Sequence, residues 1–253
     1  MIEHLSYSSI SAYLYCGANW RFKYVDKVET PASPELAFGS AFHAAIEKHL
    51  ISERRDDLLA CWSEAWKLQL EKETVEWNGA NPEVYYNDGV RMFSQAEVQQ
   101  GILSIQPGMD DVGMMLERRV SLNVPGVPVP VIGFIDVITQ DGIPGDFKTS
   151  KASWSAEKAE AEMQPLFYLA ALNQAGVNVK DWRFRHYIFV KTKTPQFQTL
   201  EHRHNPAQLL WLFQMIRNVW RGIEAGIYPE NPTGWKCSPK WCEFWQLCRG
   251  KGG

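Results

Sequence analysis

Two quartets of residues, Gly133-Phe134-Ile135-Asp136 and Gly145-Asp146-Phe147-Lys148, carry the strongest structural signal in this chain. The segments around these quartets, residues 129–139 and 143–148, are rich in β-branched residues, and Asp141-Gly142 between them is a turn signal. They predict two short neighbouring strands. Since side chains alternate along a strand, Asp146 and Lys148 point to one face and Phe147 points the other way, into the core.

Two carboxylates and one lysine near the ends of adjoining strands suit the hydrolysis of a phosphodiester. That reaction needs a cation to neutralise the phosphate, a nucleophilic water and a stabilised leaving oxygen. Because Mg²⁺ and Mn²⁺ prefer oxygen ligands, we expect Asp136, Asp146 and the backbone carbonyl of Phe147 to hold the ion. Lys148 is then expected to reach the attacking water or the phosphate. The alternative is an ordinary hairpin with a polar edge, because an Asp-x-Lys pair alone is common.

Groups on both sides of this hairpin are candidates to complete the site. His43 lies in a segment of helical spacing, residues 35–51, with Glu47 one turn after it. Gln164 and Tyr168 are four residues apart and share one helix face, where they can hydrogen-bond a nucleotide phosphate or base. The alternatives are a helical histidine with an ordinary partner and a core tyrosine.

The rest of the chain predicts an α/β protein. The expected helices are residues 6–15, 35–51, 56–76, 82–103, 156–174 and 206–225, and the expected strands are residues 114–124, 129–139, 143–148, 182–190 and 197–202. This order predicts a sheet of about four or five strands flanked by helices, with a helical segment on the N-terminal side and a Cys-rich C-terminal tail. We expect one domain over residues 1–253, with residues 35–103 as the helical segment and residues 113–225 as the core.

These elements together resemble the RecB-type branch of the PD-(D/E)XK nuclease superfamily. That branch carries a Gly-x-x-x-His helix, a Gly-x-x-Asp strand, an acidic-x-Lys strand and a Gln-x-x-x-Tyr helix. The matching residues occur in this order over nearly the whole chain: Gly39 and His43, Gly133 and Asp136, Asp146 and Lys148, Gln164 and Tyr168.

The resemblance implies a restriction-endonuclease-like core with a mixed sheet, and a metal-dependent deoxyribonuclease. In that family the histidine and the two acids, here His43, Asp136 and Asp146, bind Mg²⁺ or Mn²⁺, and the lysine, here Lys148, assists the attack. Asp146 stands where many relatives have Glu, which shortens the reach of the carboxylate but keeps the type of ligand. Glu117, on the strand before Asp136, is expected to contribute outside the direct ligands.

Four cysteines come from the two ends of the chain: Cys16 after the first helix, and Cys237, Cys242 and Cys248 in the tail. This layout is similar to that of RecB-like nucleases, including CRISPR-adaptation exonucleases and the AddB helicase–nuclease subunit, that carry one N-terminal and three C-terminal cysteines around a [4Fe–4S] cluster. The resemblance implies such a cluster here, although the first gap in the tail is x4 where x2 is expected. A Cys₄ zinc site and free buried cysteines are the alternatives.

Aromatic residues crowd this tail: Trp235, Trp241, Phe244 and Trp245. We expect them to shield a metal cluster from water. The alternative is that they stack on the bases of single-stranded DNA. The fifth cysteine, Cys61, lies beside a tryptophan in a predicted helix and is expected in the core.

Composition narrows the class of protein. A content of 45% hydrophobic and 22% charged residues is ordinary for a globular protein. No run approaches the roughly 20 apolar residues of a membrane helix, and the start of the chain shows no signal peptide, so we expect a cytoplasmic protein, bacterial or phage-encoded. A net charge of -3 excludes a globally basic nucleic-acid binder but leaves room for a basic groove.

The leading hypothesis is an exonuclease that acts on DNA ends or single strands, in recombination, repair or CRISPR adaptation. A helicase, recombinase or CRISPR-adaptation protein is the expected partner, since the chain has no Gly-x-x-x-x-Gly-Lys-Ser/Thr loop for ATP-driven unwinding. One alternative is a non-catalytic nucleic-acid-binding or assembly module with an iron–sulfur or zinc structural site. Another is a small metalloprotein with a redox or structural role.

Overall fold

The computed structural model describes residues 2–250, apart from the side chain of Lys180. The described chain divides into two compact units, each assembled from separate parts of the sequence. Unit 1 combines residues 2–30, 120–133 and 206–250, and unit 2 combines residues 31–119 and 134–205. The expected single domain over residues 1–253 stays a prediction.

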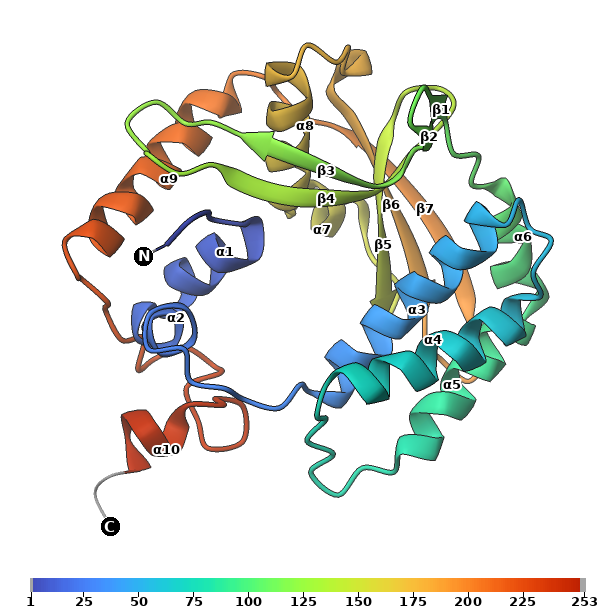
Figure 1. Ribbon diagram of the computed structural model, residues 1–253, viewed down its shortest axis with the longest axis horizontal. Coiled ribbons are helices and arrows are strands. Elements are labelled where there is room, and N and C mark those ends of the chain that lie inside the picture. The colour runs from blue at the N-terminus through green and yellow to red at the C-terminus, as the bar shows by residue number, and fades with distance from the viewer. Residues whose placement is uncertain (1, 251–253) are drawn as a thin grey trace. The chain divides into compact units, whose positions relative to one another are not determined.

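Helices open the chain and a sheet follows (Figure 1). Within residues 2–250, the helices are α1 (Tyr7–Tyr15), α2 (Gly17–Tyr24), α3 (Pro34–Ile51), α4 (Leu58–Lys72), α5 (Pro82–Ser94), α6 (Ala96–Ser104), α7 (Ala156–Ala161), α8 (Gln164–Gln174), α9 (Gln208–Glu224) and α10 (Trp245–Cys248). The strands are β1 (Met109–Asp110), β2 (Gly113–Met114), β3 (Leu116–Leu122), β4 (Val131–Ile138), β5 (Pro144–Ser150), β6 (Arg183–Val190) and β7 (Gln196–Arg203).

The main sheet of the described chain has five strands in the order β3-β4-β5-β6-β7. Strands β5 and β6 are parallel, whereas β4 pairs with β5 and β6 pairs with β7 in antiparallel fashion. Gly142, with φ +77°, lies in the predicted turn between β4 and β5, where an L side chain would be strained. The predicted α/β class, with a mixed sheet of four or five strands, is confirmed.

Two helices that the sequence predicts as continuous are each broken in two. Residues 156–174 form α7 and α8, because Pro165 in the first turn of α8 has no N–H for a bond to the preceding turn. Residues 82–103 break at Gln95, whose backbone is extended at φ -78° and ψ 125°. The Gln99 side chain donates to the carbonyl oxygen of Phe93 at 2.8 Å, which satisfies a group freed by the break.

Unit 2 packs aromatic side chains on both faces of its part of the sheet. Helices α3 to α6 cover one face (Figure 1), where Phe42 of α3 stacks on Phe93 at 4.3 Å and meets the ring of Phe189 on β6 at 5.1 Å. Phe147 and Cys61 belong to this core, as the sequence predicts. On the other face, Tyr168 of α8 stacks on Phe184 of β6 at 6.1 Å.

Unit 1 is organised around α1, α2 and α9. Ser6 caps α1 through a reciprocal bond with Ser9, as its position before the apolar spacing predicts. Trp20 of α2 is buried and contacts the rings of Tyr13, at 5.7 Å, and Tyr228, at 5.8 Å. The aromatic contacts therefore join the N-terminal helices to the C-terminal part of the chain.

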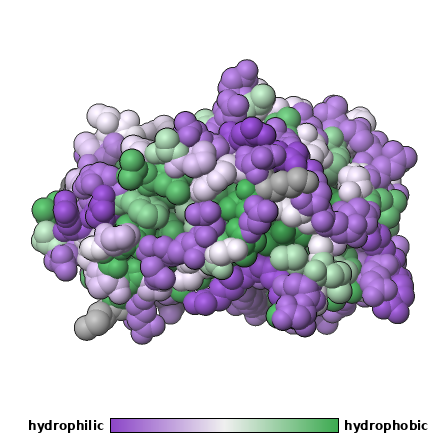
Figure 2. Space-filling model, turned by 90° about the horizontal axis from the view of Figure 1, so that it is seen from above, coloured by the Kyte–Doolittle hydropathy of each residue, from purple (hydrophilic) through white to green (hydrophobic). Residues whose placement is uncertain are grey.

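Hydrophilic residues are spread over the face of the molecule shown in Figure 2, with hydrophobic residues between them. In the described part of the chain, every helix is too short or too polar to cross a bilayer.

Candidate active site

The predicted site residues of the hairpin meet in unit 2 because of the way β4 and β5 pair. Val137 lies opposite Gly145, so the next residues along the two strands, Asp136 and Asp146, lie side by side. Asp136 retains only 8% of its surface and Asp146 only 3%. Two carboxylates are therefore held next to each other in a place where water solvates them poorly.

Asp136 receives its contacts from β5 and from helix α3. One carboxylate oxygen, Oδ2, accepts the backbone N–H of Phe147 at 2.5 Å and lies 3.5 Å from Nδ1 of His43. The His43 ring also bonds the backbone of Phe147 and meets its phenyl ring edge-on at 5.8 Å. His43 of the helical segment therefore lies beside Asp136, one of the two acids that the sequence places with it.

Burial and charge set the protonation of this part of the site. Burial, and then the neighbouring Asp146 carboxylate, raise the pKa of Asp136 well above its usual value. Burial lowers the pKa of His43, although its side chain remains 29% exposed. A neutral imidazole with a free lone pair is the form that binds metal ions.

Lys148 connects the acids to helix α8. Its ammonium lies 2.7 Å from Oδ2 of Asp146 and donates to Oε1 of Gln164 at 2.8 Å. Gln164 in turn donates through Nε2 to the hydroxyl of Tyr168 at 2.7 Å. Burial lowers the pKa of Lys148, but the attraction of Asp146 outweighs it and the net shift is upward, so the lysine stays charged. The helix face predicted from the spacing of Gln164 and Tyr168 is therefore turned toward the lysine.

Two further acids interact with the pair. Glu117 was expected from the sequence, whereas Glu47 was not predicted as a site residue. Burial, and then the charge of Asp136, raise the pKa of Glu117 to about 7. Its backbone takes φ +46° within β3, an unusual conformation for a residue with a side chain. Burial also raises the pKa of Glu47, which interacts with Glu117 and Asp136. The sequence carried a signal for Glu47, since it follows His43 by one helical turn.

The charge balance of the site favours a cation. The charge of Asp146 raises the pKa of Asp136, the charge of Asp136 raises that of Glu117, and Lys148 is the cation in direct contact with Asp146. Oxygen donors of this kind are what Mg²⁺ and Mn²⁺ prefer, so the residues fit such an ion. Within residues 2–250, no three His, Cys, Asp or Glu side chains already stand in metal-binding arrangement. At this site Lys148 contacts one carboxylate oxygen of Asp146, and the N–H of Phe147 donates to one carboxylate oxygen of Asp136.

The four cysteines predicted as a metal site gather in unit 1. Cys16, Cys242 and Cys248 pack around the small core of Phe22 and Phe244. Cys237 interacts electrostatically with Cys242 and Cys248, and none of the four forms a disulfide among the described residues. Burial raises the pKa of the Cys242 and Cys248 thiols. The donors fit a thiolate-bound group in kind and number, although they are not closed around a common point.

The expectation that the tryptophans of the tail shield this cluster is wrong for two of them. Trp235 is 67% exposed and Trp241 is 57% exposed, whereas Phe244 is buried against Phe22 at 5.5 Å. A single phenyl ring suffices to cover the small core, so the two indoles remain at the surface.

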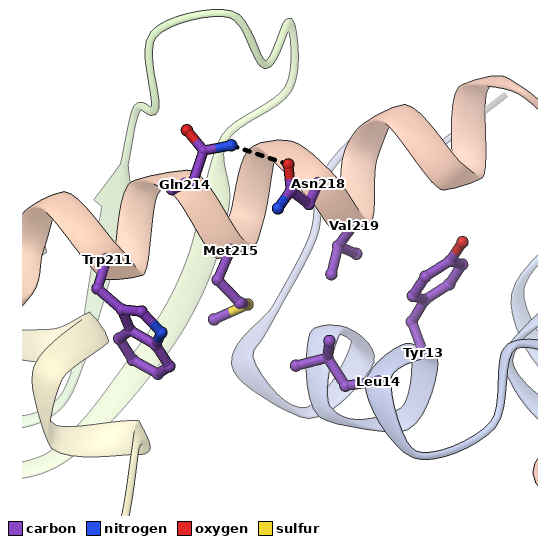
Figure 3. A pocket seen from close by; sticks show the side chains of 7 residues that line it. All are labelled: Tyr13, Leu14, Trp211, Gln214, Met215, Asn218 and Val219. Carbon is purple, nitrogen blue, oxygen red and sulfur yellow. Dashed lines mark hydrogen bonds between the residues drawn. The ribbon is translucent and has the colours of Figure 1, made fainter.

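A surface hollow of about 370 Å³ in unit 1 has a different character from the acid site. It lies between α1 and α9, where Trp211 and Met215 face Leu14 (Figure 3). The lining residues are Tyr13, Leu14, Trp211, Gln214, Met215, Asn218 and Val219. Since none of these is a carboxylate, histidine or lysine, we do not assign chemistry to this hollow.

The fold and the acid pair define the class of protein: an α/β protein with a restriction-endonuclease-like core. A family model described as the PD-(D/E)XK nuclease superfamily matches residues 4–249. The chain therefore belongs to the PD-(D/E)XK nuclease superfamily. A search among curated proteins finds no match.

A solved structure of another protein agrees with this fold. The crystal structure of a "Putative exonuclease" from Eubacterium rectale is similar with a TM-score of 0.66 and 12% identity, over 98% of this chain and 88% of that one. At this identity the likeness speaks for the fold alone. The structure of the protein SSO0001 aligns over 97% of this chain and 96% of its own with 15% identity and a TM-score of 0.38.

Proposed function

We propose that this protein is a RecB-like, metal-dependent deoxyribonuclease that hydrolyses phosphodiester bonds at DNA ends or in single-stranded DNA. The observation that supports this most is a continuous set of contacts around two buried acids. It runs from His43 to Asp136 on one side, and from Asp146 through Lys148 to Gln164 on the other. A site without catalytic use has no reason to keep both acids buried, because one lysine does not balance two buried carboxylates and the pair is costly without a metal ion.

His43, Asp136, Asp146 and the carbonyl of Phe147 are the groups that would hold the ion. When bound, Mg²⁺ or Mn²⁺ supplies positive charge at the phosphate and makes water easier to deprotonate. The charged Lys148 donates to the attacking water or to a phosphate oxygen. Gln164 fixes the direction of that ammonium through its 2.8 Å bond. Tyr168, whose pKa is raised by burial and by the charge of Asp146, keeps its proton and holds Gln164 in place.

The test uses DNA labelled at the 5′ or the 3′ end, single-stranded and double-stranded, with Mg²⁺ or Mn²⁺ and with EDTA. We expect degradation that EDTA abolishes and that Asp146→Asn slows by about 10²–10³-fold, the usual effect of removing one charge-stabilising group. Early release of one labelled end as short products would identify an exonuclease and its direction. Asp111→Asn, at an exposed acid of the same unit, is the matched control and should cleave normally.

Two outcomes would contradict the proposal. Undiminished cleavage by both Asp146→Asn and Lys148→Ala would move the activity away from these residues. DNA binding without cleavage under any metal condition would favour the non-catalytic binding module instead.

We also propose that Cys16, Cys237, Cys242 and Cys248 hold a [4Fe–4S] cluster, with Zn²⁺ as the alternative occupant. Their gathering from both ends of the chain supports this, because a bound group would tie the ends together across a long loop. Anaerobically purified protein should be brown, contain iron and sulfide, and lose its visible absorbance in Cys242→Ser. A colourless protein with stoichiometric zinc would establish the alternative, and one with neither would leave four free thiols.

The biological setting stays a prediction. A cytoplasmic enzyme of bacterial or phage origin, in recombination, repair or CRISPR adaptation with a helicase, recombinase or adaptation protein, is what the proposed activity suggests.

A further inference from the structure

The exposed part of the C-terminal tail combines indole rings with lysines in a fixed arrangement. Trp235 and Trp241 are the exposed pair, with ring centroids 5.9 Å apart and planes at 70°. Lys236 places its ammonium 5.3 Å from the centre of the Trp235 ring, and Lys240 places its own 4.9 Å from the centre of Trp241. We call these four residues the tail surface.

Hydrogen bonds hold the tail surface in shape. The backbone N–H of Lys236 donates to the hydroxyl of Tyr15 on α1 at 2.7 Å, and Asn231 donates to the Tyr15 carbonyl at 2.8 Å. Within the tail, the N–H of Trp241 donates to the carbonyl of Ser238 at 3.1 Å. The rings are thus presented on an anchored backbone, so little backbone entropy remains to be lost when a ligand binds.

The charge of the tail surface selects the kind of ligand. Residues 231–242 contain two lysines and no Asp or Glu, within a chain whose net charge is -3. Flat aromatic faces bind other flat rings, and ammonium groups beside them bind anions. A single-stranded nucleic acid offers both, since its bases are unpaired and its phosphates are negative, whereas a duplex hides its bases.

We propose that the tail surface is a stacking site for single-stranded DNA, with Trp235 and Trp241 against bases and Lys236 and Lys240 against phosphates. This rests on the proposed function, which makes DNA the substrate, and it specifies the form of DNA that the protein grips. The two indoles are binding residues and take no part in the hydrolysis.

The experiment measures binding of a fluorescein-labelled 20-nucleotide oligo(dT) in EDTA, which prevents cleavage, with a closed DNA hairpin as the duplex probe. Trp235→Ala with Trp241→Ala should weaken oligo(dT) binding about 30-fold, because two stacked bases are lost. Binding of the hairpin should be unchanged. Lys236→Gln with Lys240→Gln should reduce the dependence of log affinity on log salt by about 0.7 for each lysine.

Matched variants separate stacking from general damage. Trp235→Phe with Trp241→Phe keeps aromatic faces and should retain most of the affinity. Trp211→Ala removes an indole of similar exposure, 53%, from α9 and should have no effect. If the double alanine variant does not fold, the phenylalanine and glutamine variants still carry the test.

The outcomes for this surface and for the nuclease are distinguishable. Unchanged oligo(dT) affinity in the double alanine variant, in a protein that cleaves DNA, overturns the stacking site alone. Tryptophan-dependent binding in a protein that never cleaves overturns the nuclease and leaves the stacking site. A protein that binds no oligo(dT) but self-associates through these tryptophans overturns the stacking site in favour of a protein interface.

Discussion

Asp136 shows, at the scale of a single residue, how burial and function conflict in this site. Its carboxylate accepts one peptide N–H and faces a second acid, so its pKa is well above that of an exposed aspartate. A protein gains nothing in stability from such a group, because an uncompensated buried charge is costly. The arrangement makes sense where a cation is bound for part of the working cycle.

Tyr168 gives a prediction about positioning. Tyr168→Phe removes the hydroxyl that accepts the 2.7 Å bond from Gln164, so Gln164 is freer to turn away from Lys148. Because a neutral hydrogen bond contributes about 1 kcal/mol, we expect kcat to fall about fivefold with little change in KM. Steady-state cleavage of labelled DNA measures both constants. A lowered melting temperature with unchanged kcat would make the tyrosine purely structural.

His186 gives a prediction about stability. It is fully buried on β6, and neither ring nitrogen has a hydrogen-bond partner among the described residues. His186→Leu should therefore raise the free energy of unfolding by about 1 kcal/mol at pH 7.5, since it removes unsatisfied polar atoms from the core. Urea unfolding measures this.

His202→Leu is the contrasting variant for the same experiment. It breaks the 2.9 Å bond between the Nε2 atoms of His202 and His204, and it should destabilise. A His186→Leu variant less stable than the wild type would contradict the assignment of two unsatisfied ring nitrogens to His186.

Two elements, strands β6 and β7, carry buried histidines that should lower the free energy of unfolding in acid. His186 on β6 stacks on His202 on β7 at 5.1 Å, and burial lowers their pKa values to about 3 and about 4. In the unfolded chain both titrate near 6.5, so below that pH the unfolded state binds more protons. Stability should fall as the pH drops from about 6.5 to about 4, by up to about 1.4 kcal/mol per pH unit for each histidine.

The acid site opposes this trend, and a variant separates the two. Asp136 and Glu117 have higher pKa values in the folded state than in the unfolded chain. As the pH falls, the folded state therefore binds more protons at these two groups than the unfolded state, and this contribution stabilises the fold. Urea unfolding of the wild type and of His186→Leu at pH 7.5, 5.5 and 4.5 isolates one histidine. The variant should lose less stability over this range, and parallel losses would contradict the assignment.

Two glycines test how closely helices pack in unit 2. A Cβ on Gly39 of α3 would lie 3.7 Å from Oγ1 of Thr149, an ordinary contact, whereas one on Gly89 of α5 would lie 2.2 Å from the Trp62 ring. Both substitutions to alanine gain about 1 kcal/mol of helix propensity. Gly39→Ala should therefore stabilise and Gly89→Ala should destabilise by about 1–3 kcal/mol in thermal unfolding. Equal effects would show that the Trp62 ring moves aside freely.

The elements also show what the sequence can predict and where it stops. The β4–β5 hairpin and the helix face of Gln164 were predictable, because a period of two and a spacing of four fix which side chains share a face. The break at Gln95 was not, since apolar spacing continues through it. The exposure of Trp235 and Trp241 was also not predictable. The tail has no periodic pattern, and only the packing of Phe244 decides which ring is covered.

At the scale of the whole molecule, the two units are interleaved along the chain. Strands β3 and β4 each begin in one unit and end in the other. The residues of the acid site come from positions 43 to 168, a span interrupted by residues 120–133 of unit 1. Long sequence separations of this kind are set by the fold as a whole, which is why His43 and Asp136 share no local pattern.

Ion binding should therefore change the stability of the entire fold, and Asp136→Asn tests this. Asparagine keeps an oxygen for the N–H of Phe147 but removes the buried charge that repels Asp146, so the metal-free variant should melt higher than the wild type. Mn²⁺ at a hundred times its dissociation constant should stabilise the wild type by about 2.7 kcal/mol, because it binds only the folded state.

In Asp136→Asn this Mn²⁺-dependent rise in melting temperature should be lost, whereas Asp111→Asn should respond to Mn²⁺ as the wild type does. Differential scanning calorimetry with MnCl₂ and with EDTA measures both effects. Asp136→Asn should raise the melting temperature without metal and abolish the further rise with Mn²⁺. General damage to the fold would lower the melting temperature and cannot imitate this combination. An equal Mn²⁺ shift in wild type and Asp136→Asn would remove Asp136 from the ion site, and with it the physical reason for two adjoining buried acids.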